Sequence, residues 1–243
     1  PVMDSVRAAE IHLANTIMTK VYESPRGNQS FTASIEKAVF GSNDGTTRDA
    51  FSTAGGCGAL TLGMSLIKRA SPDNIVYIST PTWPNHPHVI DFCGLKSSAY
   101  PYIGSDRKNI DLDGMISVFK NAPSGSTILL QGPCHNPTGV DLSSEEWSAV
   151  AEVCVENALL PFLDIAYHGF AQSLEKDISN IRAFLEKVPN ALVSYSCSKN
   201  FGLYRERTGC LLLKAENSKS RDAASTHLAD ITRAINSMPP AHG

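Results

Sequence analysis

The sequence lacks a long apolar run and an excess of charge of either sign. Its 243 residues include 21 Lys and Arg against 24 Asp and Glu, which gives a formal net charge of -3. A near-neutral chain has no basic stripe, so nucleic acid is not an expected partner. No apolar run approaches the roughly 18–20 residues that a membrane helix needs, so we expect no membrane contact. The first residues also lack the pattern of a secretory signal peptide.

Closely spaced cysteine pairs are missing as well. The chain has six cysteines, scattered without a C-x-x-C motif: Cys57, Cys93, Cys134, Cys154, Cys197 and Cys210. This spacing argues against a disulfide framework and against a zinc site, so no metal is expected. We therefore expect free thiols in a reducing, intracellular and cytoplasmic setting. An organelle is the alternative, because a transit peptide could have been removed.

What the chain does contain is an alternation of strand-like and helix-like segments. Short apolar runs predict five strands, at residues 74–80, 126–132, 159–164, 190–196 and 209–214. Amphipathic stretches predict helices at residues 57–70, 112–122 and 143–158. Ser143 or Ser144 is the expected N-cap of the third helix. Strands that alternate with helices predict an α/β fold, a three-layer sandwich with a mostly parallel central sheet.

Unusual residues gather in the loops that follow four of these strands. The loops read PTWPNH, GPCHNPTG, IAYHGF and CSKNFG. The carboxyl ends of parallel strands meet at one edge of a sheet, where such folds bind ligands. We therefore expect the four loops to form one site. The alternative for any single loop is that its Gly, Pro and Asn serve only a turn.

Asp164 and Lys199 stand at the ends of two of these strands. A carboxylate at the end of a buried strand is costly unless it is paired. Asp164 is therefore either a helix N-cap or surface acid, or the partner of a protonated ring nitrogen on a cofactor. Lys199 is either a solvated surface lysine or an amine that forms a Schiff base. Arg207 could bind a phosphate, with Ser196 and Ser198 as hydroxyl donors.

Two further features fit a phosphorylated aromatic cofactor. AGGCGAL, at residues 54–60, is a glycine-rich turn entering a helix, and backbone N–H groups at a helix start bind phosphate well. It is neither a complete G-x-G-x-x-G nor a Walker motif, which argues against a dinucleotide or a nucleoside triphosphate. Trp83 could stack on a cofactor ring, and its alternative is a partly buried core side chain.

Six segments, in order along the chain, carry a family resemblance. They are GGCGAL, PTWPNH, CHNPTG, LDIAYHGF, SCSKNFGLYRERTG and SMPPAHG. Together they resemble the pyridoxal-phosphate aminotransferases of the aspartate aminotransferase family, which have fold type I. The resemblance implies pyridoxal 5'-phosphate as cofactor, and amino acids and 2-oxo acids as substrates. It also implies that the chain is truncated at both ends, with the small domain largely missing.

The resemblance assigns a role to each matching residue. Lys199 matches the lysine that bonds covalently to the cofactor and then moves a proton. Asp164 matches the acid that pairs with the pyridine nitrogen, and Tyr167 and Asn136 match the pair that hydrogen-bonds the cofactor's phenolic oxygen. Trp83 matches the residue stacked on the ring. Trp83 and Asn136 are also expected to contact the substrate.

The same resemblance implies a phosphate site and a dimer. The phosphate-binding residues are expected to be Gly56, Cys57, Ser196, Ser198 and Arg207. Tyr22, in VYESPRGNQSF, resembles a tyrosine that reaches the phosphate of the neighbouring subunit, which implies a homodimer with shared active sites. Residues 1–30 are then expected to form an N-terminal helix and dimer-contact segment, and residues 31–243 the cofactor-binding large domain.

Two residues depart from the family pattern. Cys57 stands where threonine is usual, which loses a hydroxyl group but keeps the backbone N–H. Gln131 stands where histidine is common, which changes the hydrogen bonds on the pyridine side.

The expected activity is transfer of the amino group between L-aspartate, with 2-oxoglutarate, and oxaloacetate, with L-glutamate, by a ping-pong mechanism. Two alternatives stay open. One is an aromatic or other amino-acid aminotransferase of the same branch. The other is a truncated homologue that binds the cofactor without catalysis.

Overall fold

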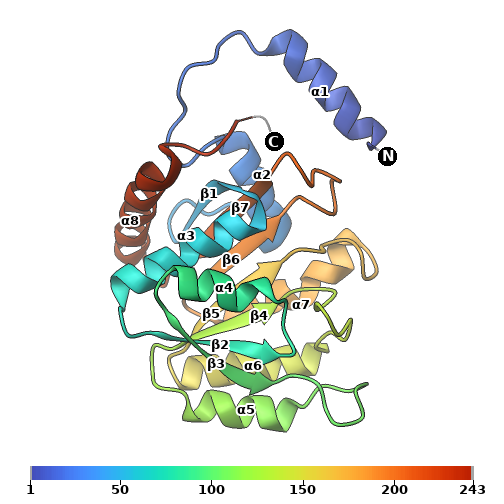
Figure 1. Cartoon of the computed structure of the whole chain (residues 1–243), viewed down its shortest axis with the longest axis vertical. Helices are drawn as coiled ribbons and strands as arrows, with labels where there is room; N and C mark the ends of the chain where they lie inside the picture. Colours follow the sequence, from blue (N-terminus) through green and yellow to red (C-terminus); the bar gives the residue numbers. More distant parts are fainter. Residues whose placement is uncertain (1, 242–243) are drawn as a thin grey trace.

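A seven-stranded sheet forms the centre of the molecule (Figure 1). The computed structural model describes residues 2–241. The strands are β1 (Arg48–Ala54), β2 (Ile75–Thr80), β3 (Lys96–Pro101), β4 (Thr127–Gln131), β5 (Leu160–Ile165), β6 (Ala191–Ser196) and β7 (Thr208–Lys214). Their order across the sheet is β1-β7-β6-β5-β4-β2-β3. Neighbouring strands from β6 to β3 pair in parallel, and β7 pairs antiparallel with both β6 and β1.

Helices cover both faces of this sheet. They are α2 (Gln29–Phe40), α3 (Gly55–Ala70), α4 (Asn85–Phe92), α5 (Leu112–Asn121), α6 (Ser144–Glu156), α7 (Leu174–Lys187) and α8 (Ser218–Asn236); a further helix, α1 (Asp4–Thr16), precedes them in the chain. One apolar layer contains buried residues of α2, α5, α6 and α7, and the other contains those of α3, α4 and α8. The predicted three-layer α/β sandwich with a mostly parallel sheet is therefore confirmed. Within residues 2–241, no helix combines the length and the apolar character that crossing a bilayer requires.

The central strands are visible in the sequence because they are covered on both sides. In β5, Phe162 belongs to one apolar layer and Leu163 to the other, and both are fully buried. Side chains of a strand point alternately to opposite faces, so a strand covered twice is apolar along its whole length. The five predicted strands agree with β2, β4, β5, β6 and β7 to within one residue at each end.

The two strands without a predicted counterpart, β1 and β3, are the edges of the sheet. β3 reads KSSAYP and exposes its first four residues, so it has no apolar run. β1 reads RDAFSTA and buries the polar residues Ser52 and Thr53 along with its apolar ones. A strand that is half polar does not show the periodicity from which strands are predicted.

The predicted helices correspond to α3, α5 and α6, and Ser143 is the N-cap of α6. The Ser143 hydroxyl accepts a hydrogen bond from the Glu146 N–H, and the Glu146 carboxylate accepts one from the Ser143 N–H. The expected N-terminal helix is α1, which has no buried residue and lies apart from the sheet in Figure 1. The division of the chain at residue 30 stays a prediction. Helices α2, α4, α7 and α8 have no counterpart among the predicted elements.

Helix α3 packs unusually close to the sheet beneath the candidate site. A Cβ atom at Gly63 would lie 2.5 Å from the ring of Phe162, which is fully buried. At Gly58, in the same helix, the nearest atom to an added Cβ is the Thr53 Cβ at 3.4 Å, an ordinary contact. Glycine at position 63 therefore sets the distance between α3 and β5.

We expect Gly63→Ala to destabilise the protein, because its methyl group would overlap a ring that has no room to move. Overpacking of this kind costs about 1–3 kcal/mol, against a gain of up to ~1 kcal/mol when alanine replaces glycine in a helix. Gly58→Ala is the matched control and should be neutral or stabilising. Urea unfolding of both variants measures the difference, and equal stabilities would contradict this packing.

Candidate active site

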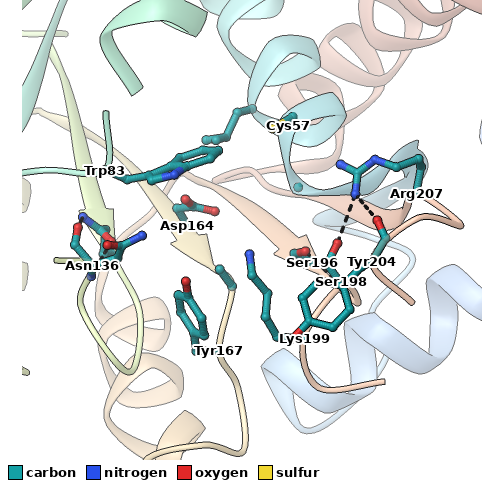
Figure 2. A pocket seen from close by; sticks show the side chains of 14 residues that line it. Cys57, Trp83, Asn136, Asp164, Tyr167, Ser196, Ser198, Lys199, Tyr204 and Arg207 are labelled. Atoms are coloured by element: carbon teal, nitrogen blue, oxygen red, sulfur yellow. Dashed lines mark hydrogen bonds between the residues drawn. The ribbon is translucent and has the colours of Figure 1, made fainter. Parts of the chain in front are cut away.

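The loops after β2, β4, β5 and β6 meet where the carboxyl-terminal ends of these strands lie, and they line a cavity of about 180 Å³ (Figure 2). Most of the predicted site residues line this cavity: Gly56, Cys57, Trp83, Asn136, Asp164, Tyr167, Ser196, Ser198, Lys199 and Arg207. The other lining residues are Leu60, Gln131, Ala166 and Tyr204. The four loops therefore form one site rather than four separate turns.

Asp164 lies near the end of β5 and is only 8% exposed. Its Oδ2 is 3.0 Å from Nε2 of His86, and its Oδ1 accepts a hydrogen bond from Ser194 Oγ at 3.1 Å. A buried carboxylate is costly unless it is paired, and these two contacts supply the partners. Because Asp164 is inside a strand and buried, the alternatives of a helix N-cap and a surface acid do not apply.

His86 does not line the cavity, but it contacts Asp164, and sequence reasoning missed this role. Its ring is buried, and its Nδ1 lies 2.7 Å from Thr82 Oγ1, so both ring nitrogens have partners. The Trp83 ring packs edge-on against it, with centroids 5.3 Å apart. The sequence does contain a signal, since His86 is the last residue of the loop PTWPNH that follows β2. Only the placement of α4 on the sheet brings it to Asp164.

Gln131, at the end of β4, holds the turn that carries Asn136. Its side-chain Nε2 donates to the Asn136 carbonyl, and its Oε1 accepts from the Asn136 N–H, both at 2.9 Å. The same Nε2 lies 3.5 Å from Thr82 Oγ1, on the side of the site where His86 is found. Gln131, one of the two residues that depart from the family pattern, is thus part of the hydrogen bonding around Asn136.

His135, next to Asn136, belongs to the scaffold. Its ring stacks on Tyr102 with centroids 3.8 Å apart, and its nitrogens lie 3.0 Å from Ser79 Oγ and 2.9 Å from Thr138 Oγ1. Burial, assisted by the nearby His86, lowers the pKa of His135 to about 4. The ring is therefore neutral at neutral pH and brings no charge to the site.

Lys199 reaches the cavity from the loop after β6. Its Nζ lies 4.9 Å from the centroid of the Tyr167 ring, within the range at which an aromatic face attracts a cation. Figure 2 shows Lys199 and Tyr167 side by side, with the lysine nitrogen and the tyrosine oxygen both directed toward the side of the cavity where Asp164 lies. The lysine is half-buried. It is therefore not simply a solvated surface lysine.

The opposite side of the cavity has the character of an anion site. Gly56 and Cys57 belong to the first turn of α3, where backbone N–H groups have no partner within the helix. Arg207 donates from Nη1 to Ser198 Oγ at 3.2 Å and to the Tyr204 carbonyl at 2.7 Å, which fixes its guanidinium beside this turn. A guanidinium, serine hydroxyls and a helix start together suit a phosphate group.

Two glycines allow the guanidinium to lie so close to α3. Gly55 has a φ of +72°, and a Cβ there would lie 2.5 Å from Nη2 of Arg207. A Cβ at Gly209, on β7, would lie 2.5 Å from the carbonyl carbon of Gly55. A side chain at either position would displace the turn or the arginine. The local shape therefore fits an anion bound between Arg207 and the helix start.

Tyr22 does not line the cavity of its own chain. It is 87% exposed, in the segment between α1 and α2. Its neighbours Met18 and Val21 are also exposed. The expected contact of Tyr22 with the phosphate of a second subunit stays a prediction.

Comparison with known proteins agrees with this geometry. The family model for class I and II aminotransferases matches residues 2–243. The aromatic-amino-acid aminotransferase of Paracoccus denitrificans is 38% identical over 244 residues, and the aspartate aminotransferase of Escherichia coli (strain K12) is 38% identical over 248 residues. Each match covers 100% of this chain and 62% of the relative, so the chain spans less than two thirds of their length.

A solved structure is similar over the whole chain. It is the aromatic-amino-acid aminotransferase of Burkholderia pseudomallei, covalently bound to pyridoxal phosphate. The TM-score is 0.96 at 34% sequence identity, and the match covers 100% of this chain and 62% of that one. Sequence and fold thus agree: the chain belongs to the class I and II aminotransferase family.

Proposed function

We propose that this chain binds pyridoxal 5'-phosphate and acts as an aminotransferase. The observation that carries the proposal is one cavity with a buried carboxylate, an amine and an anion site, supplied by Asp164, Lys199 and Arg207. These groups suit, in turn, a ring nitrogen, an aldehyde and a phosphate ester on one aromatic ring. The covalent pyridoxal phosphate of the Burkholderia relative supports the choice of cofactor. When bound, this cofactor supplies an aldehyde that takes up the amino group and a ring that withdraws electrons.

Asp164 is proposed to hold a proton on the ring nitrogen. His86 and Ser194 fix its carboxylate in place, and a buried negative charge favours a positive charge beside it. A cationic ring accepts electrons better than a neutral one. Trp83 is proposed to stack on the ring, and Tyr167 and Asn136 to hydrogen-bond its phenolic oxygen.

Lys199 is proposed to bond to the aldehyde and, once released, to carry the proton from the substrate's Cα. Covalent bonding requires an amine without its extra proton, and proton transfer requires the same amine to act as base and then as acid. Its position beside Tyr167, facing the cavity, supports both roles.

The phosphate is proposed to bind between the start of α3 and the loop after β6. The residues that would hold it are Gly56, Cys57, Ser196, Ser198 and Arg207. Backbone N–H groups of the helix turn and the Arg207 guanidinium supply charge and donors. At Cys57 the backbone N–H serves this purpose, because a thiol is only a weak donor.

The substrates are proposed to be amino acids and 2-oxo acids, with L-aspartate and 2-oxoglutarate preferred. Aspartate aminotransferases from Escherichia coli and from the yeast cytoplasm support this choice. An aromatic amino acid is the second candidate, since the Paracoccus and Burkholderia relatives are aromatic-amino-acid aminotransferases. A different alternative for the function is that the chain is a homologue that binds the cofactor without catalysis.

The assembly is proposed to be a homodimer in which each subunit contributes to both sites. The support is Tyr22, which is exposed together with Met18 and Val21 and does not reach its own cavity. The setting is proposed to be intracellular and cytoplasmic. Its support is that the six cysteines are free thiols, three of them buried.

We expect borohydride reduction of the chain loaded with pyridoxal phosphate to attach the cofactor to Lys199, because reduction makes the lysine bond permanent. Peptide mass mapping locates the attachment. Lys199→Ala should lose it and reduce turnover by about 10²–10⁴-fold, the range for a missing general acid–base. Lys176→Ala, at an exposed position on α7, is the control and should be labelled like the wild type. Label on another residue, or none, would overturn the proposed function.

We expect aspartate to convert the bound cofactor faster than phenylalanine does, as seen by the loss of its aldehyde-dependent absorption. Equal rates, or a preference for phenylalanine, would replace the aspartate proposal with the aromatic one. A band that no amino acid changes, on a chain that does bind the cofactor, would favour the non-catalytic homologue.

We expect mixed dimers of Tyr22→Ala and Lys199→Ala subunits to regain activity that neither variant has alone. In such a dimer one site combines Tyr22 of one subunit with Lys199 of the other, while the second site lacks both. The two variants are refolded together and assayed against each refolded by itself. If mixing restores nothing although dimers form, Tyr22 does not act across the interface.

A further inference from the structure

A network of hydrogen bonds joins His168, Tyr195 and Asn200, which do not line the cavity and have no role in the proposed function. His168 Nε2 lies 2.7 Å from the Leu174 carbonyl, and His168 Nδ1 lies 2.8 Å from the Tyr195 hydroxyl. The amide of Asn200 donates to the same hydroxyl at 3.0 Å. His168 and Tyr195 are only 3% and 2% exposed.

The hydrogen-bond partners of His168 and Tyr195 determine which atoms of this network carry the hydrogens. A carbonyl oxygen only accepts, so His168 Nε2 carries a hydrogen and donates to Leu174. In a neutral ring Nδ1 is then an acceptor, and the Tyr195 hydroxyl donates to it. The Tyr195 oxygen is left to accept from Asn200. Burial raises the pKa of Tyr195, which keeps its hydroxyl protonated and able to donate.

This hydrogen-bond network connects the loop that carries Tyr167 with the loop that carries Lys199. His168 follows Tyr167 in the loop after β5, and Asn200 follows Lys199 in the loop after β6. Tyr195, on β6, stands between them. After Lys199 the backbone hydrogen bonds of this loop are local, for example from the Gly202 N–H to the Lys199 carbonyl. Much of the loop is exposed to solvent. The bond from Asn200 to Tyr195 therefore ties an exposed loop to the buried sheet beside the lysine.

We propose that Tyr195 and His168 are positioning residues that set the reach of Lys199 toward the cofactor's aldehyde. This inference rests on the proposed function of the cavity. Tyr195 touches neither Lys199 nor the phosphate site by any hydrogen bond within residues 2–241, so its effect passes through Asn200. Removing the Tyr195 hydroxyl should therefore weaken the covalent bond between Lys199 and the aldehyde, and leave the contacts to the cofactor's phosphate and ring intact.

Two forms of the cofactor separate these effects. Pyridoxal phosphate binds through ring, phosphate and lysine, whereas pyridoxamine phosphate carries an amine in place of the aldehyde and cannot bond to Lys199. We expect Tyr195→Phe to weaken pyridoxal phosphate about tenfold, the scale of one or two lost hydrogen bonds, and to leave pyridoxamine phosphate unchanged within about twofold. Equilibrium titration followed by fluorescence or absorption measures both constants.

Tyr100→Phe is the matched control. Tyr100 is equally buried, on the edge strand β3, and its hydroxyl donates to the Leu129 carbonyl at 2.8 Å. This variant loses one buried hydrogen bond on a strand far across the sheet from Lys199. Both cofactor forms should therefore bind with the same affinity as in the wild type. Asn200→Ala serves as a second test variant that removes no buried ring, and it should give the same selective loss as Tyr195→Phe.

Several outcomes would overturn the inference. Equal weakening of both cofactor forms, or the same loss in Tyr100→Phe, would mean a general structural effect. Unchanged binding of pyridoxal phosphate in both Tyr195→Phe and Asn200→Ala would mean that the network does not position the lysine. If the wild-type chain binds neither form, the proposed function itself fails, which is a separate and recognisable result.

Discussion

The pairing of Asp164 with His86 and Ser194 is the interaction on which the arrangement of the site depends. A carboxylate buried near the end of β5 is stable only with hydrogen-bond partners, and its two partners come from different elements. His86 comes from α4 and Ser194 from β6. Ser194 Oγ also lies 3.2 Å from the Gly56 carbonyl in α3, which links the carboxylate to the anion site. The charge that would face a ring nitrogen is thus connected to the group that would hold the phosphate.

The fold explains why these groups converge. Four parallel strands have their carboxyl-terminal ends on the same side of the sheet, so the loops after β2, β4, β5 and β6 share one cavity. Helix α3 adds its first turn to the same side, and Gly63 and Gly209 allow it to lie close to β5 and β7. The buried His135 ring is neutral at neutral pH, so it adds no charge beside Asn136. The result is a preorganised set of donors and charges, which is the form in which electrostatic stabilisation is most effective.

Much of this could be predicted from the sequence. The central strands were predictable because they are apolar on both faces, and the site loops because their unusual residues all follow such strands. The edge strands were not, since β1 and β3 mix polar and apolar residues. The role of His86 could not be predicted, because no spacing in the sequence connects it to Asp164, which lies 78 residues away. The network of His168, Tyr195 and Asn200 was equally hidden: a buried tyrosine in a strand shows no partner until the loops are folded beside it.

The central claim of this account is that a fixed, buried Asp164 carboxylate keeps a proton on the cofactor's ring nitrogen. Nitrogen-15 NMR of the chain loaded with ring-labelled pyridoxal phosphate tests it directly. The account predicts the chemical shift of a protonated pyridinium in the wild type at neutral pH, and that of an unprotonated nitrogen in Asp164→Ala. An unprotonated nitrogen in the wild type, or the same protonated shift in both proteins, would contradict it.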